Sequence, residues 1–251
     1  MGLSFKDTLV FRFKEGNLQP VKHPHIPSFD TLLCIERQKE EARRNTLKLV
    51  KGLPSHDALL WGDRGTGKSS LVKSMLGLFG KDGLRLIQVY KMDIEHVSDL
   101  YEPLREAKEK FILFFDDLSF EEGDERVNVL KSLMDGDVEE RPENVVIYAT
   151  SNSRKLGLGH TVDEKFPEES RACVLSLLER FGLRLGFFTF GKDDYLKIVR
   201  HYAEIRDIKM ERIEETSLEW ARNRGGFSGR LAYQFIKELE GNELGELHNA
   251  P

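Results

Sequence analysis

Cysteine is scarce in this sequence. The 251-residue chain contains two cysteines, Cys34 and Cys173, and neither belongs to a paired motif of the kind that binds zinc or an iron–sulfur cluster. The sequence therefore does not predict a disulfide-stabilised secreted domain or a thiolate metal site. We expect two reduced, buried thiols.

Long apolar segments and an excess of positive charge are also missing. No run approaches the roughly 20 residues of a membrane helix, and the N-terminus lacks the apolar centre of a signal peptide. We therefore expect a cytoplasmic protein with no membrane partner. The formal net charge is −5 at pH 7, which does not indicate nucleic-acid binding, although it leaves local basic patches open.

One stretch has the pattern of a phosphate-binding loop. Gly62 is followed by four residues and then by Gly67, Lys68 and Ser69, between an apolar run and a helix-like segment. Glycines let backbone N–H groups approach phosphate oxygens, and the following helix directs its positive end at the same anion. Lys68 is expected to reach the β- and γ-phosphates, and Ser69 to hold Mg²⁺. The nucleotide-binding residues predicted here are Gly62, Asp63, Arg64, Gly65, Thr66, Gly67, Lys68, Ser69 and Ser70.

Strand-like and helix-like segments alternate through the middle of the chain. Five apolar runs have the length of strands, at residues 58–61, 84–89, 111–115, 145–150 and 183–190. This alternation predicts an α/β fold with a five-stranded parallel sheet and helices on both faces. From residue 192 onward the pattern is helical only, which predicts a small C-terminal helical domain.

Polar residues follow two of these runs. Asp116 and Asp117 come directly after one strand, and Asn152 follows the next. Ligands of parallel α/β sheets lie beyond the carboxyl ends of the strands, so these side chains are expected to meet the phosphate loop. Asp116 would anchor Mg²⁺ opposite Ser69, and Asp117 would orient or deprotonate the attacking water. Two acids could also simply end a strand at the surface, but the phosphate loop upstream favours the nucleotide site.

With these motifs in order, the chain resembles the AAA+ ATPases from about Phe29 to Leu239. The resemblance implies a P-loop core that binds ATP and Mg²⁺, followed by a helical lid. It also implies that Asn152 is the sensor 1 residue near the γ-phosphate. Three stretches, around residues 60–70, 115–124 and 148–152, further resemble an uncharacterised prokaryotic AAA+ group labelled as a domain of unknown function.

The same resemblance assigns roles to two arginines. Arg180, just before Phe181 and Gly182, would be the arginine finger that reaches the nucleotide of a neighbouring subunit. Its alternative is a surface ion pair with Glu179 or another acid. Arg230, at the start of the last predicted helix, would be the sensor 2 residue that contacts the phosphates from the lid. An ordinary charge in a first helical turn is its alternative, although the helix dipole disfavours a cation there.

These features divide the chain into four expected parts. They are an extended N-terminal segment (1–28), an AAA+ α/β core (29–190), a helical lid (191–240) and a flexible tail (241–251).

Asp117 departs from the AAA+ pattern, which usually has glutamate at this position. Aspartate is one methylene shorter, so its carboxylate would lie back by more than an ångström, roughly one C–C bond. Either the local backbone compensates or hydrolysis is slow. Glu121 and Glu122 are alternative bases in the following loop, although a solvated acidic loop is the favoured interpretation.

The motifs predict a Mg²⁺-dependent ATPase that uses Lys68 and Asp117 in the attack of water on the γ-phosphate, and the resemblance implies that Asn152 and Arg180 take part as well. A finger acting in trans implies a homo-oligomer, as a ring or partial ring. The expected task is remodelling or loading of a macromolecular client, and no motif supports nucleic acid as that client. An ATP-dependent binding switch or scaffold with little hydrolysis is the alternative, and a phosphotransferase is a weaker one.

Overall fold

The computed structural model describes residues 4–121, 123–136, 140–153, 156, 168–209 and 211–248. The chain divides into two compact units. The first, the α/β unit, contains Met1–Phe29, Arg37–Gly62 and Lys68–Gly186. The second, the helical unit, contains Asp30–Glu36, Asp63–Gly67 and Phe187–Pro251.

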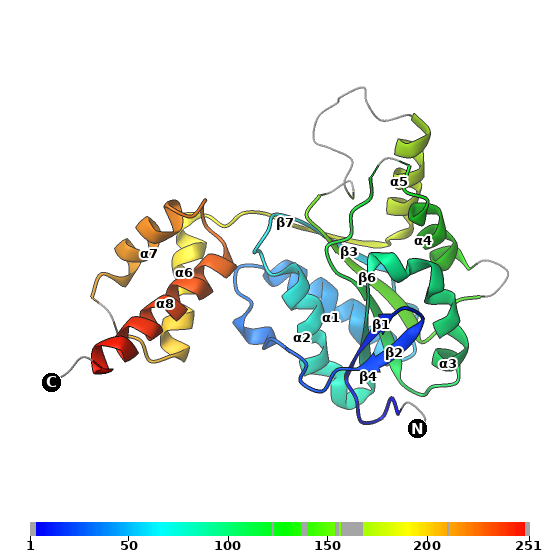
Figure 1. The fold of residues 1–251 in the computed structure, drawn as a ribbon, viewed down its shortest axis with the longest axis horizontal. Helices are drawn as coiled ribbons and strands as arrows, with labels where there is room; N and C mark the ends of the chain where they lie inside the picture. Colours follow the sequence, from blue (N-terminus) through cyan, green and yellow to red (C-terminus); the bar gives the residue numbers. More distant parts are fainter. Residues whose placement is uncertain are drawn as a thin grey trace. The chain divides into compact units, whose positions relative to one another are not determined.

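A seven-stranded sheet in the order β2-β1-β4-β5-β6-β3-β7 runs through the α/β unit (Figure 1). The strands are β1 (Val10–Lys14), β2 (Asn17–Pro20), β3 (Ala58–Gly62), β4 (Leu84–Val89), β5 (Lys110–Phe115), β6 (Val145–Ser151) and β7 (Leu183–Phe187). The neighbouring pairs β1–β4, β4–β5, β5–β6 and β3–β6 are parallel. The predicted α/β fold with a parallel sheet is therefore confirmed, and all five predicted strands belong to that sheet.

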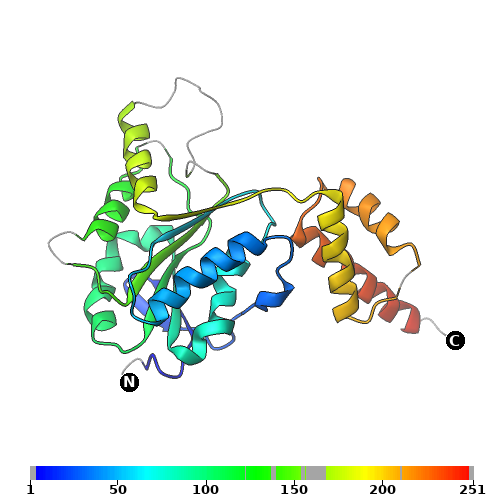
Figure 2. The same cartoon turned by 180° about the vertical axis from the view of Figure 1, so that it is seen from behind.

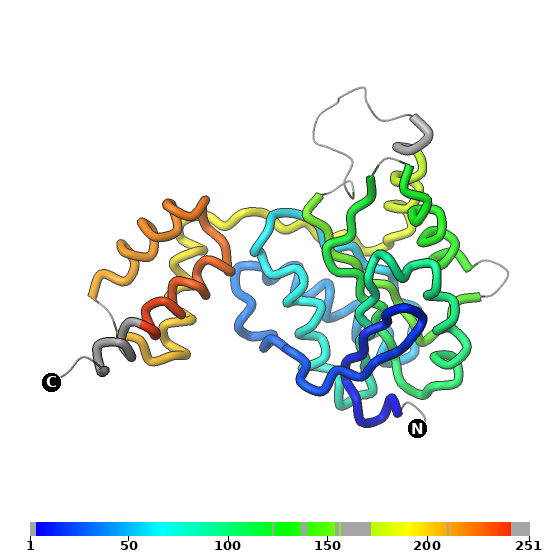
Figure 3. Tube along the Cα trace, in the orientation of Figure 1, coloured from blue at the N-terminus to red at the C-terminus, as the bar shows by residue number. Residues whose placement is uncertain are grey.

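The two additional strands come from the N-terminal segment. β1 and β2 form an antiparallel hairpin around Glu15 and Gly16, which both have a positive φ. Phe11 and Phe13 are fully buried because alternate residues of β1 face the core. β1 then pairs in parallel with β4, so this segment extends the predicted sheet at one edge. Figure 3 traces the chain onward from this N-terminal segment, which is blue.

Helices cover both faces of the sheet (Figures 1 and 2). They are α1 (Glu36–Val50), α2 (Lys68–Phe79), α3 (Tyr101–Arg105), α4 (Arg126–Asp135) and α5 (Glu168–Arg180), with the 3-10 helices η1 (Phe29–Thr31), η2 (Gly80–Asp82) and η3 (Lys91–Leu100). Apolar side chains of η3, α3, α4 and α5 pack in one buried cluster with Phe111, Leu113 and Phe115 of β5. On the other face, Asn45 of α1 donates a hydrogen bond to the Tyr148 hydroxyl of β6 at 2.9 Å.

The helical unit contains α6 (Lys192–Ile205), α7 (Ile213–Arg222) and α8 (Gly229–His248). Tyr195 of α6 is buried and lies 5.0 Å from Phe227, measured between ring centroids. α8 continues to His248, beyond residue 240, the expected end of the lid. Within the described ranges, no helix has the length and apolar character needed to cross a membrane.

Candidate functional site

The phosphate loop connects β3 to α2, as the sequence predicts. Gly62, Gly65 and Gly67 have φ angles of 129°, 75° and 100°, a region that residues with a side chain rarely adopt. α2 begins at Lys68, so the N–H groups of its first turn follow the loop directly. The pattern of glycines is therefore explained by the backbone conformation of the loop.

Gly65 lies against the start of α8 within the helical unit. A Cβ at this position would be 2.9 Å from Ser228 Oγ and 3.2 Å from Arg230 Cβ. The backbone N–H of Arg230 donates to Gly65 O at 3.3 Å. Arg230, the predicted sensor 2 residue, is thus placed beside the phosphate loop, and its side chain is exposed.

The segment before α1 also lies against the loop. The side chains of Leu32 and Ile35 come within 3.9 Å and 3.6 Å of a Cβ built at Gly67. Cys34 has a φ of 62°, and its Sγ donates to Asp194 O at 3.8 Å. Burial, reinforced by Asp194, raises the pKa of the Cys34 thiol to about 11, so this group is a neutral thiol at physiological pH.

Asp63 and Thr66 form hydrogen bonds that hold the loop. Asp63 Oδ2 accepts hydrogen bonds from the backbone N–H and the hydroxyl of Thr189, both at 2.7 Å. Thr66 Oγ1 donates to Asp63 O at 2.7 Å. Arg64 is exposed and Ser70 is half-buried on α2.

Lys68 and Asn152, which are far apart in the sequence, are brought together. Lys68 Nζ donates to Gly62 O at 2.8 Å and to Asn152 Oδ1 at 3.2 Å. The lysine is 7% exposed, so these hydrogen bonds are largely shielded from solvent. Lys68 and the end of β6 therefore belong to one polar site.

Asp116 and Ser69 also meet. Ser69 Oγ donates to Asp116 Oδ1 at 2.5 Å, and Lys73 Nζ lies 4.0 Å from Asp116 Oδ2. In the described part of the chain no group of three or more His, Cys, Asp or Glu side chains could hold a metal alone. A hydroxyl and one carboxylate nevertheless suit Mg²⁺ in nucleotide sites, where phosphate and water oxygens supply the remaining ligands.

Asp117 occupies an uncommon backbone position. Its φ is 57°, and its Oδ1 accepts a hydrogen bond from Asn152 Nδ2 at 2.5 Å. The amide of Asn152 thus joins Lys68 on one side to Asp117 on the other. Thr150 was not predicted as a site residue. Its hydroxyl bonds to the carboxylate of Asp116 and to the backbone N–H of Asp117. The available signal was a polar residue near the end of an apolar strand.

Further along the chain, the carboxylate of Asp124 is buried and pairs with two basic side chains. This side chain is 5% exposed and accepts from Lys91 Nζ at 2.6 Å and from Arg126 Nε at 2.7 Å. Burial would raise the pKa of Asp124, but the hydrogen bonds from Arg126 and Lys91 outweigh it and lower the pKa. Of the alternative bases, Glu121 is exposed, and Glu122 lies outside the described residues.

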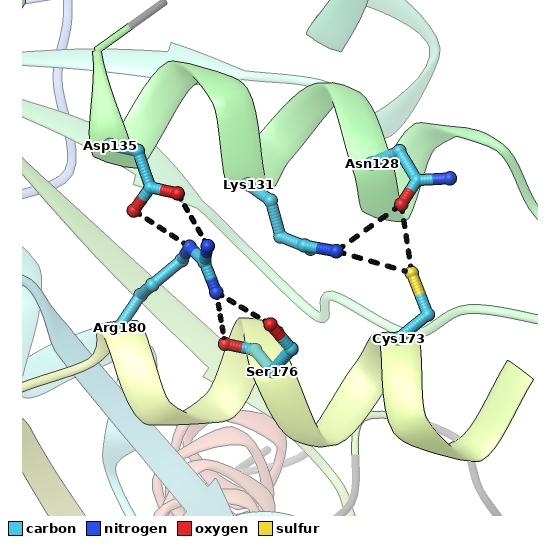
Figure 4. Close-up of polar contacts among 6 residues, drawn as sticks. All are labelled: Asn128, Lys131, Asp135, Cys173, Ser176 and Arg180. Carbon is cyan, nitrogen blue, oxygen red and sulfur yellow. Dashed lines mark hydrogen bonds and ion pairs between the residues drawn. The ribbon is translucent and has the colours of Figure 1, made fainter. Parts of the chain in front are cut away.

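Arg180 makes its contacts with α4 and α5 (Figure 4). Its Nε donates to Asp135 Oδ1 at 2.7 Å, and its Nη2 also contacts Asp135 Oδ2. Its Nη1 donates to the Ser176 carbonyl at 2.6 Å and the Ser176 hydroxyl at 2.7 Å. Arg180 therefore forms a bidentate ion pair within its own chain. Its partner is Asp135 and not Glu179.

Comparisons with known proteins give a family and a fold. A family model described as "Protein of unknown function (DUF815)" matches residues 6–243. No curated protein matches the chain. A similar solved structure is RuvB, the Holliday junction branch migration motor of Thermotoga maritima, with a TM-score of 0.51 and 14% identity over 84% of this chain and 72% of RuvB.

Two more solved structures are similar to most of this chain. A mutant of the same RuvB has a TM-score of 0.52 and 15% identity over 84% of this chain and 72% of that one. The Orc1 protein of Aeropyrum pernix in complex with DNA has a TM-score of 0.48 and 15% identity over 89% of this chain and 72% of Orc1. The likeness to RuvB confirms the AAA+ fold that the sequence predicts.

Proposed function

The chain belongs to the DUF815 family, and we propose that it binds ATP and hydrolyses it with Mg²⁺. One observation carries this proposal: a chain of hydrogen bonds links the phosphate-loop lysine, Lys68, through Asn152 to the carboxylate of Asp117. Beside it, the adjacent oxygens of Ser69 and Asp116 would hold Mg²⁺. These are the groups that phosphoryl transfer to water requires.

Each of these groups has a distinct task in the proposed reaction. Lys68 stabilises negative charge on the phosphate oxygens, and Asp117 with Asn152 orients the attacking water. Oxygen of that water bonds to the γ-phosphorus as the bond to the ADP oxygen breaks, and Asp117 accepts the proton. Mg²⁺, held by Ser69 and Asp116, would neutralise charge on the phosphates.

The two arginines extend the proposal to an assembly. Arg230 would contact the phosphates, supported by its place beside Gly65. Arg180 would act on the nucleotide of a neighbouring copy, which requires it to leave Asp135. Activity of a homo-oligomer would then be coupled to remodelling or loading of a macromolecular client.

An ATP-dependent binding switch is the second candidate, and Asp117 is the observation in its favour. The carboxylate is one methylene shorter than that of glutamate, and its Oδ1 is already bonded to Asn152. A base so placed would activate water poorly. ATP would then order the protein for binding a partner, with hydrolysis incidental.

Steady-state phosphate release separates the two functions. For an ATPase we expect Asp117→Asn to lower turnover by about 100-fold, the general-base contribution, while ATP affinity changes little. Asp99→Asn is the matched control, because Asp99 is an exposed carboxylate on η3. Tight ATP binding with negligible turnover that Asp117→Asn leaves unchanged would favour the switch, and absence of ATP binding would refute both.

A further inference from the structure

Thr150 contacts three consecutive residues of the segment that follows β5. Its hydroxyl donates to Asp116 Oδ1 at 2.7 Å and accepts from the backbone N–H of Asp117 at 2.9 Å. Its carbonyl oxygen accepts from the N–H of Leu118 at 2.7 Å. Thr150 is 2% exposed, so water does not replace these bonds.

The segment that Thr150 holds has an unfavourable backbone conformation. Asp117 has a φ of 57°, a value at which residues with a Cβ suffer steric repulsion. This residue turns the chain so that two adjacent carboxylates bind different partners. Asp116 meets Ser69, and Asp117 meets Asn152. Such a conformation persists only where surrounding contacts hold it.

The Thr150 hydroxyl is well suited to hold this backbone conformation because it can form only a few hydrogen bonds at once. A threonine hydroxyl has one proton to donate and lone pairs to accept with. Here the proton goes to Asp116, and a lone pair receives the N–H of Asp117. The orientation of one carboxylate is therefore tied to the backbone of the other.

We propose that Thr150 is a positioning residue that fixes the Mg²⁺-binding carboxylate of Asp116 and the water-directing carboxylate of Asp117 as one unit. This inference rests on the proposed nucleotide site and adds a residue to it. Removing the hydroxyl would disturb both the metal affinity and the reaction, while leaving the phosphate loop intact.

The test compares three variants with the wild-type protein. Thr150→Val keeps the shape of the side chain and removes the hydroxyl, and Thr150→Ser keeps the hydroxyl. Thr46→Val is the matched control, since Thr46 is fully buried on α1 and its hydroxyl bonds to Ala42 and Tyr148. For each protein, ATP affinity is measured with and without Mg²⁺, together with turnover and the unfolding temperature without ligand.

Thr150→Val should bind ATP without Mg²⁺ within about twofold of wild type. Its gain in affinity on adding Mg²⁺ should fall by about tenfold, the loss expected for a hydrogen bond to a charged group, and turnover should fall by at least as much. Thr150→Ser should stay within about threefold of wild type. Thr46→Val should retain the full Mg²⁺ effect even where its unfolding temperature falls.

Wild-type Mg²⁺ dependence and turnover in Thr150→Val would overturn the inference and leave the proposed function standing. An equal loss of the Mg²⁺ effect in Thr46→Val would also overturn it, because the hydroxyl would then act only on stability. If valine prevents folding, Thr150→Ala provides the same comparison. A wild-type protein that binds no ATP would overturn the proposed function itself, and this inference with it.

Discussion

Asp135 on α4 binds the guanidinium group of Arg180 on α5, with Arg180 Nε donating to Asp135 Oδ1 at 2.7 Å (Figure 4). The pair joins two helices on the same face of the sheet. It also sets a condition on any role of Arg180 in trans, because the arginine must exchange Asp135 for the phosphates of another copy.

Replacing Arg180 tests that role. If Arg180 acts in trans, ATP turnover per subunit should rise with protein concentration. We expect Arg180→Ala to abolish this rise and to lower turnover in the assembly by roughly 10³-fold, as loss of an arginine finger does. ATP affinity of the isolated chain should not change. Removing the partly exposed ion pair should cost less than about 1 kcal/mol of folding stability.

Arg184→Ala is the control, because Arg184 is an exposed arginine on the neighbouring strand β7. Turnover should be measured over a hundredfold range of protein concentration. Equal turnover of Arg180→Ala and Arg184→Ala at every concentration would show that Arg180 only supports the α4–α5 contact.

A comparison of alanine variants at Gly65 and Gly52 separates the effect of backbone strain from the effect of steric contact with neighbouring side chains. Gly65→Ala places a side chain at a φ of +75° and 2.9 Å from Ser228 Oγ, whereas Gly52→Ala meets a similar φ of +69° in open space. Both should lose about 1 kcal/mol of stability from strain. Gly65→Ala should in addition lower ATP affinity by more than about tenfold, because the start of α8 and Arg230 must shift, an effect of the size seen when positioned groups are displaced.

Urea unfolding and titration with a fluorescent ATP analogue measure these two effects. The prediction fails if Gly65→Ala and Gly52→Ala bind the analogue equally well.

Asp124 predicts a pH dependence of stability. The pKa of this carboxyl is lower in the folded protein than in the unfolded chain, so its contribution is present above the unfolded value of about 3.9 and is lost as pH falls through the folded pKa. At pH 7, Asp124→Asn should therefore be less stable by about 1–3 kcal/mol, the range for buried hydrogen bonds to a charge. The difference from wild type should shrink as pH falls below about 3.9.

Urea unfolding at several pH values checks this, with Asp99→Asn as an exposed control. A difference between wild type and Asp124→Asn that stays constant as the pH falls would contradict the stated role of the charged carboxylate.

The sequence was sufficient to predict the parts of the site that depend on local pattern and on sheet geometry. Apolar runs of strand length located β3 to β7, and parallel strands place their carboxyl ends at one edge, so the meeting of Asn152 with Lys68 could be expected. The glycine pattern predicted the loop because those backbone conformations need glycine.

Side-chain partners across the fold could not be predicted in this way. The Arg180–Asp135 pair and the two hydrogen bonds of the Thr150 hydroxyl depend on how helices and strands pack, and no local pattern encodes them. The place of β1 beside β4 could not be predicted either, because pairing with a distant strand is decided by the exposed edge available in the assembled sheet.

That hairpin has a consequence for how the protein behaves in concentrated solution. β4 is almost entirely buried, and without β1 its backbone N–H and C=O groups would form an open edge able to recruit other chains. The strand that now ends the sheet on this side is β2, which has four residues and terminates at Pro20, a residue without an N–H to offer. We therefore expect β1 and β2 to lower the tendency of this chain to aggregate through that edge of the sheet.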